Sequence, residues 1–448
     1  MSTVAVVGGG IAGLSAAFSL SAAHDVTVFE QEDAPGGKIR SQALDGFLFE
    51  WGPSGFLSNA PELNALAAEL GLTDAVIDAR PEAKKRFIYW DGKLHELPSK
   101  PPGIVSMSLL SPAGKLRAFC ELFVPRRVDS GEEESVYAFM ARRFGREVAE
   151  RIATPALLGV SGGDAAFTSL AAVFPRLPEL ERERGSVIRG MLRGSPTASQ
   201  MPSSRTASQM RSFAGGGMQR LTGRLTERLG DRVQLGTTVT QIEPDGAAWR
   251  IVHDRGETRV RRVIVATPAF AAAGLVAGFD AALAQQLGAI AYAPMRVIGA
   301  GFRRADVAAP LDGFGFLAAR GSGVRILGAT YTSSMLPDQA PPGTVYVRIF
   351  MGGATDPGAA LLDTEAARAI ALGDLATTLG ITATPIAYHE MVWHHAIPQY
   401  GLGHRKRVQT IEQLTQAHPG LALIGNAYRG LGVNDTVRDA RAAATRTS

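Results

Sequence analysis

The chain has 448 residues, 46% hydrophobic and 20% charged, which excludes a wholly disordered protein and allows about three domains. Its formal net charge of +4 comes from 46 basic and 42 acidic side chains, an excess too small to indicate nucleic-acid binding. The single cysteine, Cys120, excludes an intramolecular disulfide and a multi-thiolate zinc site. No apolar run reaches the roughly 20 residues of a membrane-spanning helix, so none is predicted.

The N-terminus has the pattern of a nucleotide-binding unit. Small and β-branched residues at 3–7 predict a buried strand that leads directly into a GxGxxG sequence and a helix. The first glycine permits a tight turn, the second lets the main chain approach a pyrophosphate, and the third lets the helix pack on the strand. The phosphates are expected at the helix N-terminus, where unpaired amides favour negative charge. The residues predicted to bind the cofactor here are Gly8, Gly10, Ile11, Ala12 and Gly13.

Two features beyond this motif specify the cofactor further. A second predicted strand at 26–29 ends in Glu30, whose carboxylate is placed to accept hydrogen bonds from the hydroxyls of an unphosphorylated ribose. A glycine pair then precedes a basic residue, so Gly37 and Lys38 are predicted cofactor contacts. A protein that binds only NAD does not need this second element, whereas one that holds both the pyrophosphate and the ring system of FAD does. The pattern therefore favours FAD.

The next segments are scaffold, a hairpin and a helical region. Residues 61–72 predict a helix, and 86–90 followed by an Asp-Gly pair predict a hairpin that begins at Arg86. Residues 104–127 combine apolar and basic side chains in short helices, which suits either a lipid surface or a lid on the core. A helix is predicted over 135–158, followed by a glycine-dense turn at Gly159.

The second half contains an insertion and the return of the nucleotide domain. Residues 194–212 contain TASQM twice and predict a flexible surface insertion without chemistry. Strands are predicted between 233 and 265, and the last of them leads into ATPA, which indicates that the chain has rejoined the nucleotide domain. Residues 270–418 predict an α+β domain. Near the C-terminus a strand at 421–424 is followed by a glycine loop and a closing helix that could hold a second part of the cofactor. The predicted contacts there are Gly425, Asn426, Val433 and Asn434.

These pieces together resemble the oxygen-dependent protoporphyrinogen oxidases, FAD enzymes of the amine-oxidase and phytoene-desaturase superfamily, and the internal segments are most similar to the myxobacterial type. The resemblance rests on the order of the motifs GGGIAGLSAA, GGK, KRFIYWDGKLHELP, LDGFGFL, MGGATDP, HHAIPQYGLGH and IGNAYRGLGVND. It implies an α/β plus α+β fold with three domains: a discontinuous Rossmann-like FAD domain of the p-hydroxybenzoate hydroxylase type at 1–80, 213–269 and 419–448, a mixed-sheet substrate domain at 81–98 and 270–418, and a helical membrane-binding domain at 99–212 that ends in the insertion.

The resemblance also implies site residues. Val239 would offer its backbone to the adenine end of FAD, and Arg86 would pair with a propionate of a tetrapyrrole, which suits a guanidinium fork. Phe314 and Leu317 would form flat apolar walls of the pocket. The further candidates for substrate contact are Phe350, Met351 and Gly159. The turn after Gly159 departs from the family, since the tyrosine that usually follows Gly-Val is absent.

The implied activity is the six-electron oxidation of protoporphyrinogen IX to protoporphyrin IX in haem biosynthesis, with O₂ as acceptor and H₂O₂ as product. The flavin performs the chemistry, so no catalytic side chain and no metal ligand is expected. The expected location is cytoplasmic and peripheral to the inner membrane, and a homodimer is compatible with the pattern. The alternatives are coproporphyrinogen III oxidation by the same architecture, a carotenoid or amine oxidoreductase, and a flavin-binding scaffold without turnover.

Overall fold

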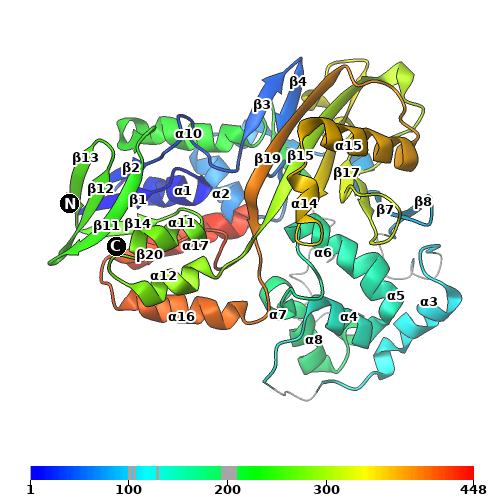
Figure 1. The fold of residues 1–448 in the computed structure, drawn as a ribbon, viewed down its shortest axis with the longest axis horizontal. Helices are drawn as coiled ribbons and strands as arrows, with labels where there is room; N and C mark the ends of the chain where they lie inside the picture. Colours follow the sequence, from blue (N-terminus) through cyan, green and yellow to red (C-terminus); the bar gives the residue numbers. More distant parts are fainter. Residues whose placement is uncertain (1, 99–102, 104–106, 128–130, 193–208, 448) are drawn as a thin grey trace.

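The computed structural model describes residues 2–98, 103, 107–127, 131–192 and 209–447. Figure 1 shows a parallel sheet with helices packed on both sides, a larger mixed sheet beside it, and a helical unit below the larger sheet. Most of the predicted insertion, 194–208, lies outside the described residues.

The glycine motif belongs to a five-stranded sheet in the order β10-β2-β1-β14-β20. All four pairings are parallel, so the carboxyl ends of the strands meet at one edge. The strands come from three separate parts of the chain: β1 (Thr3–Val7), β2 (Asp25–Phe29), β10 (Val233–Gln234), β14 (Arg262–Val265) and β20 (Leu421–Leu423).

Both faces of this sheet are covered, which explains its continuous apolar strands. Val4 and Val6 of β1 face one core, while Ala5 and Val7 face the other. The helices on the first face are α1 (Ile11–Leu20), α2 (Pro61–Glu69), α10 (Gln219–Leu229) and α17 (Val433–Thr447). The second face is covered by β11 (Val239–Asp245), β12 (Ala248–His253), β13 (Gly256–Val260), α11 (Ala269–Val276), α12 (Ala281–Gly288) and α16 (His404–Gln416).

A seven-stranded sheet in the order β19-β15-β18-β17-β16-β7-β8 forms the second unit. Its pairings are antiparallel except between β16 and β7. The predicted hairpin is confirmed, and its turn at Asp91 and Gly92 has the positive φ values that an Asp-Gly turn requires. The strands are β7 (Arg86–Trp90), β8 (Lys93–Glu96), β15 (Tyr292–Arg303), β16 (Gly315–Ala318), β17 (Gly328–Thr330), β18 (Thr344–Gly352) and β19 (Ala387–Pro398).

The two faces of the larger sheet have different neighbours. Helix α15 (Thr364–Leu379) covers one face with Ala367, Ala371 and Leu375. The other face packs against the hairpin β3 (Ser41–Leu44) and β4 (Phe47–Glu50), and at β7 and β16 against the helical unit. This second face is therefore turned toward both other units. The remaining short elements are α13 (Thr332–Met335), α14 (Pro357–Ala360), η1 (Thr73–Ala75), η2 (Pro81–Lys84), η7 (Gly230–Arg232), η8 (Arg304–Asp306) and η9 (Pro337–Gln339).

The helical unit corrects one prediction. The single helix predicted over 135–158 is broken at Gly145, which has φ +97 and ends one helix before the next begins. A π-helical turn at Ala149–Ala153 follows the break. The elements of this unit are α3 (Pro112–Phe119), η4 (Cys120–Phe123), α4 (Val136–Phe144), α5 (Arg146–Val148), η5 (Ala149–Ala153), α6 (Thr154–Ser161), α7 (Leu170–Val173), α8 (Arg176–Arg184) and α9 (Val187–Leu192).

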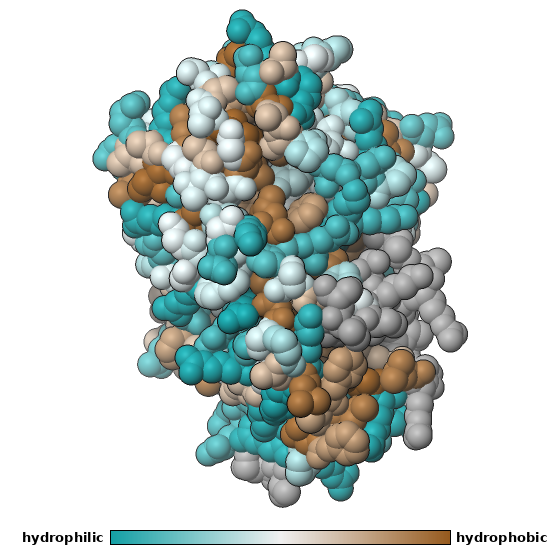
Figure 2. Space-filling view, turned by 90° about the vertical axis from the view of Figure 1, so that its right-hand side faces the viewer, coloured by the Kyte–Doolittle hydropathy of each residue, from teal (hydrophilic) through white to brown (hydrophobic). Residues whose placement is uncertain are grey.

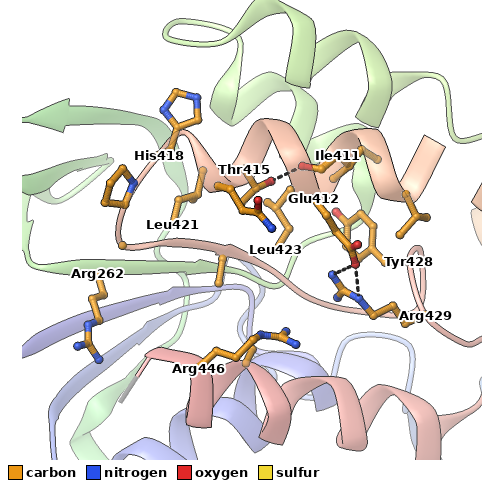
Figure 3. Close-up of a pocket in the computed structure, with 16 residues that line it drawn as sticks. Arg262, Ile411, Glu412, Thr415, His418, Leu421, Leu423, Tyr428, Arg429 and Arg446 are labelled. Carbon is orange, nitrogen blue, oxygen red and sulfur yellow. Dashed lines mark hydrogen bonds and ion pairs between the residues drawn. The ribbon is translucent and has the colours of Figure 1, made fainter. Parts of the chain in front are cut away.

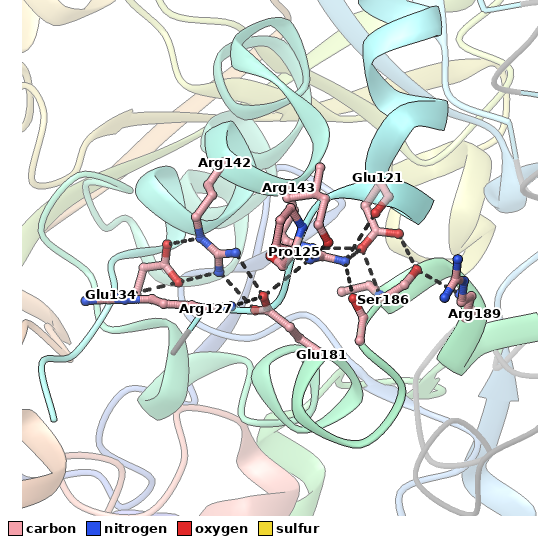
Figure 4. A network of polar contacts seen from close by, with 12 residues as sticks. Glu121, Pro125, Arg127, Glu134, Arg142, Arg143, Glu181, Ser186 and Arg189 are labelled. Atoms are coloured by element: carbon pink, nitrogen blue, oxygen red, sulfur yellow. Dashed lines mark hydrogen bonds and ion pairs between the residues drawn. The ribbon is translucent and has the colours of Figure 1, made fainter. Parts of the chain in front are cut away.

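A buried ionic network holds this unit together (Figure 4). Arg143 of α4 and Glu121 of η4 are fully buried and paired, and Glu121 also accepts the hydroxyl of Ser186. The neighbouring Arg142 donates to both Glu134 and Glu181. Because removal of one partner would leave an uncompensated buried charge, this network ties η4 to the helices beside it.

The described end of the predicted insertion is ordered, which is a second correction. Residues Met210–Phe213 form strand β9, which pairs with β5 (Phe56–Leu57) and β6 (Val76–Asp78). Phe213 is buried against Phe56 with ring centroids 5.5 Å apart. The prediction that the flexible insertion extends to residue 212 was therefore wrong at its C-terminal end. This short strand pairs with strands, and packs against a core residue, that are far away in sequence.

Candidate cofactor and substrate site

The glycine motif leaves room for a ligand at the carboxyl edge of the parallel sheet. A Cβ atom on Gly13 would overlap the carbonyl oxygen of Gly8, so strand and helix pack as closely as the motif predicts. A Cβ atom on Gly10 would meet no heavy atom within 4 Å, which leaves open space beside that residue. Gly10 is also the N-cap of α1, and no side chain caps this helix end. These features fit a pyrophosphate.

Glu30, the predicted ribose contact, directly follows β2 at the carboxyl edge of the parallel sheet. Its side chain is buried at the end of β2, and its two oxygens accept from the amides of Gly9 at 2.6 Å and Glu32 at 3.0 Å. The amide of Thr237 donates to the carbonyl of Glu30 at 2.8 Å, which brings the start of β11 to the same place. Val239 lies two residues further along, at the beginning of β11.

The second glycine element lies directly on the first. The amide of Gly36 donates to the carbonyl of Gly9 at 2.9 Å, and Gly37 has φ +57 beside Gly10. Burial lowers the pKa of the Lys38 ammonium to about 8. Its Nζ lies 5.1 Å from the centre of the Tyr292 ring. A half-buried cation beside two glycine turns is suited to an anionic group such as a pyrophosphate.

The C-terminal glycine loop is held in place by residues to which the sequence assigned no role. The Tyr400 hydroxyl donates to the carbonyl of Asn426 at 2.7 Å and accepts from the amide of Gly430 at 2.9 Å. Asp439 accepts from the amide of Gly425 and pairs with Arg429. The tyrosine of the PQYGLGH motif was the available signal, because a tyrosine between two predicted elements can bond to a loop through its hydroxyl.

Asn434 has a local role that the sequence did not reveal. Its side-chain oxygen accepts from the amides of Glu62 and Leu63, so it caps helix α2. A cofactor contact at Asn434 would therefore come from its main chain or from its side-chain nitrogen. Val433 begins α17 beside it, at the helix N-terminus predicted to face the cofactor.

Arg86 and the predicted apolar walls lie along neighbouring strands of the large sheet. Gly315 of β16 is the direct partner of Arg86 in β7, and Leu317 is the partner of Ile88. The guanidinium carbon of Arg86 lies 5.2 Å from the centre of the Phe314 ring. The sheet thus brings together the three predicted substrate residues Arg86, Phe314 and Leu317. Arg86 and Phe314 are 228 positions apart in the sequence.

Helix α6 meets this face through its glycines. A Cβ atom on Gly159 would lie 2.7 Å from a methyl carbon of Leu317, so the absence of a side chain lets the helix lie against β16. Gly162 ends the helix in the left-handed conformation, and its carbonyl accepts from the amide of Ala354 at 2.7 Å. The Gln399 side chain donates to the carbonyl of Ser161. The glycines therefore fix the helical unit against the sheet.

Phe350 and Met351 differ because neighbouring strand residues point to opposite faces. Phe350 lies on the face that is turned toward the other units, and the guanidinium of Arg348 lies 4.9 Å from its ring centre. Met351 is fully buried in the core beneath α15. The predicted substrate contact at Met351 is therefore corrected to a core position.

A cavity of about 590 Å³ lies elsewhere, between α16, β20 and α17 (Figure 3). The Arg429 and Glu412 pair that supports the C-terminal loop forms part of its wall. None of the residues predicted to bind cofactor or substrate lines this cavity. Within the described ranges, no cluster of three or more histidine, cysteine or acidic residues could hold a metal ion.

Residues 11–447 match the model of the family described as flavin containing amine oxidoreductase. This chain belongs to the flavin-containing amine oxidoreductases. The match covers nearly the whole chain and begins at residue 11, directly after the first two glycines of the motif. The cofactor of this oxidoreductase is FAD, as its second glycine element and C-terminal loop predicted.

Full-length relatives of this flavin oxidoreductase are named as porphyrinogen oxidases. The chloroplastic protoporphyrinogen oxidase of Oryza sativa subsp. japonica is 31% identical over 99% of this chain and 87% of its own length. The protoporphyrinogen oxidase of Homo sapiens is 31% identical over 99% and 97%, and the coproporphyrinogen III oxidase of Bacillus subtilis is 29% identical over 98% and 96%. The resemblance to protoporphyrinogen oxidases is thereby confirmed.

Solved structures agree on the fold. A candidate protoporphyrinogen oxidase from Exiguobacterium aligns with a TM-score of 0.86 over 99% of this flavin oxidoreductase and 98% of that chain, at 24% identity. A reduced UDP-galactopyranose mutase aligns with a TM-score of 0.75 at 16% identity. Among the helices that the structure describes, none has the length and apolar character needed to span a bilayer.

Proposed function

We propose that this flavin oxidoreductase oxidises a porphyrinogen to the porphyrin in haem biosynthesis, with protoporphyrinogen IX as substrate and O₂ as acceptor. One substrate molecule loses six electrons and six protons, and three O₂ become three H₂O₂. The observation that carries the proposal is that Arg86 and Leu317 lie on one face of the sheet. Gly159 of α6 packs against Leu317 on this face. A cation at the edge of an apolar wall suits a flat macrocycle that carries carboxylates.

The chain's residues would hold FAD at the carboxyl edge of the parallel sheet, within a Rossmann-like domain formed by 1–80, 213–269 and 419–448. Gly10 and the start of α1 would face the pyrophosphate, Glu30 the ribose, and Lys38 the negative charge. When bound, FAD supplies the two-electron acceptor chemistry.

The protein contributes binding, orientation and exclusion of water. Arg86 would bind a propionate through its planar guanidinium, while Phe314 and Leu317 would hold the ring plane. Correct placement of the reacting carbon alone can lower the activation free energy by several kcal/mol. No acid or base side chain is assigned to the chemistry.

The decisive experiment follows porphyrin fluorescence in air after addition of protoporphyrinogen IX to FAD-loaded protein. Fluorescence should rise with enzyme concentration, and Arg86→Gln should raise KM about tenfold or more while bound FAD stays constant. Lys84→Gln, an exposed cation two residues away, is the matched control and should leave KM unchanged. Yellow protein that oxidises no porphyrinogen would refute the proposal and favour an amine or carotenoid oxidoreductase or a scaffold without turnover.

Coproporphyrinogen III is the second candidate substrate, because the Bacillus subtilis relative of that name covers 96% of its own length in the match. The same assay with coproporphyrinogen III compares the two directly.

We also propose that the helical unit, within 99–212, attaches the cytoplasmic enzyme to the inner membrane. Figure 2 shows apolar surface gathered in the lower part of the molecule, and α9 packs against η4 there. Five exposed apolar side chains belong to α3, η4 and α9: Leu116, Phe119, Phe123, Met191 and Leu192. Exposed Arg126 lies beside them in sequence, and such a combination suits anionic lipid.

Cosedimentation with vesicles that contain phosphatidylglycerol tests the membrane proposal. Phe123 is 80% exposed, so its side chain is available to contact lipid. Phe123→Asp should reduce the fraction of protein bound to vesicles several-fold, because it removes this apolar contact. Leu361→Asp alters an exposed leucine of the sheet unit and should leave binding unchanged. Equal binding of all three proteins would contradict the proposal.

A further inference from the structure

A second arginine lies on the same face of the large sheet as Arg86. Arg348 of β18 is opposite Thr330 of β17, and Thr330 is opposite Gly315 of β16. Gly315 is in turn opposite Arg86 of β7. Residues that are directly opposite in a sheet point to the same face. Arg348 and Arg86 therefore stand at the two ends of one row, and three interstrand spacings separate their backbones by about 14 Å.

The next row on this face carries the apolar walls. Phe350 is opposite Gly328, Gly328 is opposite Leu317, and Leu317 is opposite Ile88. Glycine thus occupies a central position in both rows. A face with an arginine and an apolar side chain at each end, and no side chain at Gly315 and Gly328, is suited to a flat ligand with charged groups on opposite edges.

Arg348 is buried and forms no direct ion pair with a carboxylate of the described residues, although Glu50 interacts with it electrostatically from a greater distance. Its side chain is only 4% exposed, and its guanidinium donates to the carbonyl of Gly52. Its Nε is buried and has no hydrogen-bond partner among the described residues, and no carboxylate in those residues lies within ion-pair distance of it. The oxygens of nearby Glu50 accept instead from the Ser41 hydroxyl and the Met218 amide. A buried cation with no direct ion pair and an unpartnered Nε is costly, and such a group is a candidate for a ligand site.

We propose that Arg348 is a second carboxylate-binding residue that favours porphyrinogens with propionates on opposite edges. The proposal rests on the proposed porphyrinogen oxidation. Protoporphyrinogen IX carries two propionates on adjacent pyrroles, so Arg86 alone can serve that edge. Coproporphyrinogen III carries one propionate on each of its four pyrroles, so its opposite edge also needs a cation. Arg348 supplies that cation beside Phe350, at the end of the face near the cofactor element.

The competing explanation is a purely structural link. Gly52, which accepts from Arg348, packs closely against the carbonyl of Lys38 in the cofactor element. If Arg348 served only this link, its loss would weaken the binding of both porphyrins equally or change the flavin environment. A substrate role instead predicts a selective loss.

The test measures equilibrium binding of coproporphyrin III and protoporphyrin IX to the FAD-loaded protein by fluorescence quenching. Arg348→Gln should weaken coproporphyrin III binding about tenfold or more and protoporphyrin IX binding less than twofold, since a hydrogen bond to a charged group is lost only in the first case. Arg86→Gln should weaken both. Binding of neither porphyrin to the wild-type protein would refute the proposed function itself, and equal effects of Arg348→Gln on both would overturn this inference alone.

A second variant keeps Arg348 in place. Thr330→Glu introduces a carboxylate at the neighbouring position of the row, where it can pair with Arg348 and compete with a propionate. It should weaken coproporphyrin III binding selectively, whereas Thr330→Gln, which has the same shape without the charge, should not. A shift of the flavin absorption spectrum in Arg348→Gln with unchanged porphyrin binding would assign Arg348 to the cofactor and overturn the proposal.

Discussion

The hydroxyl of Tyr400 lies 2.7 Å from the carbonyl oxygen of Asn426 and joins the end of the large sheet to the C-terminal loop that is predicted to contact the cofactor. The same hydroxyl accepts from the amide of Gly430, so one side chain satisfies two main-chain groups of a glycine-rich loop. Arg429 of the loop pairs with Asp439 and Glu412, and Tyr400 adds two bonds to the main chain. Its conformation therefore depends in part on a residue that follows β19 of the other sheet.

Removal of this hydroxyl should loosen the cofactor. Tyr400→Phe leaves the ring in place but deletes both hydrogen bonds, and we expect FAD affinity to fall about fivefold to tenfold. The measurement is titration of the apoprotein with FAD by flavin fluorescence. Tyr428→Phe is the matched control, because the buried Tyr428 hydroxyl has no hydrogen-bond partner among the described residues and its loss should leave affinity unchanged.

A methyl group at Gly159 should disturb the substrate wall. Gly159→Ala places a Cβ atom 2.7 Å from Leu317, so that leucine must move while helix propensity improves. We expect a drop of about tenfold in kcat/KM for protoporphyrinogen IX with bound FAD unchanged, because misplacement of substrate lowers the rate steeply. Gly373→Ala in α15, where a Cβ atom meets open space, should keep full activity. Unaltered kinetics in Gly159→Ala would remove this glycine from the substrate site.

The charge of Lys38 should make FAD binding dependent on pH. Burial places the Lys38 pKa at about 8, and a pyrophosphate favours the protonated ammonium, so affinity should fall as pH rises through about 8. Lys38→Arg, whose guanidinium stays charged, should bind FAD with little pH dependence over the same range. The apoprotein should show the opposite trend in stability. Between about 8 and 10.5 the unfolded chain holds the proton more firmly than the folded chain, so the free energy of unfolding rises with pH. A flat FAD affinity in the wild type would contradict the placement of Lys38 near the phosphates.

The buried pair in the helical unit should matter far more than an exposed one. Arg143→Met leaves the Glu121 carboxylate buried without its partner and should destabilise this unit by about 3–5 kcal/mol, measured by urea unfolding. The comparison is Arg146→Met, which removes an exposed pair with Glu150 and should leave the unfolding midpoint unchanged. Equal midpoints for the two variants would show that the network in Figure 4 adds little to stability.

Predictions that depend on neighbouring residues were correct where local chemistry controls the structure. The first strand occupies residues 3–7 as predicted, and α15 begins after Asp363 and ends before Gly380 because an aspartate N-cap and a left-handed glycine fix its ends. The same local reasoning failed at Gly145, where a glycine within an apolar helical pattern adopts a positive φ and breaks the helix.

The sequence by itself determined the identity of the cofactor and the local structure around the glycine motif. The strand, the GxGxxG turn and Glu30 lie within 30 residues. The position of each is set by local backbone geometry or by the strand that directly precedes it. Only the tertiary structure decided the rest. Side chains alternate between the two faces of β18, so Phe350 faces the other units whereas Met351 faces the core under α15. Arg348 lies in one row with Arg86 because three strand pairings connect segments that are distant in sequence. Such pairings depend on burial across the whole sheet, and no local pattern encodes them.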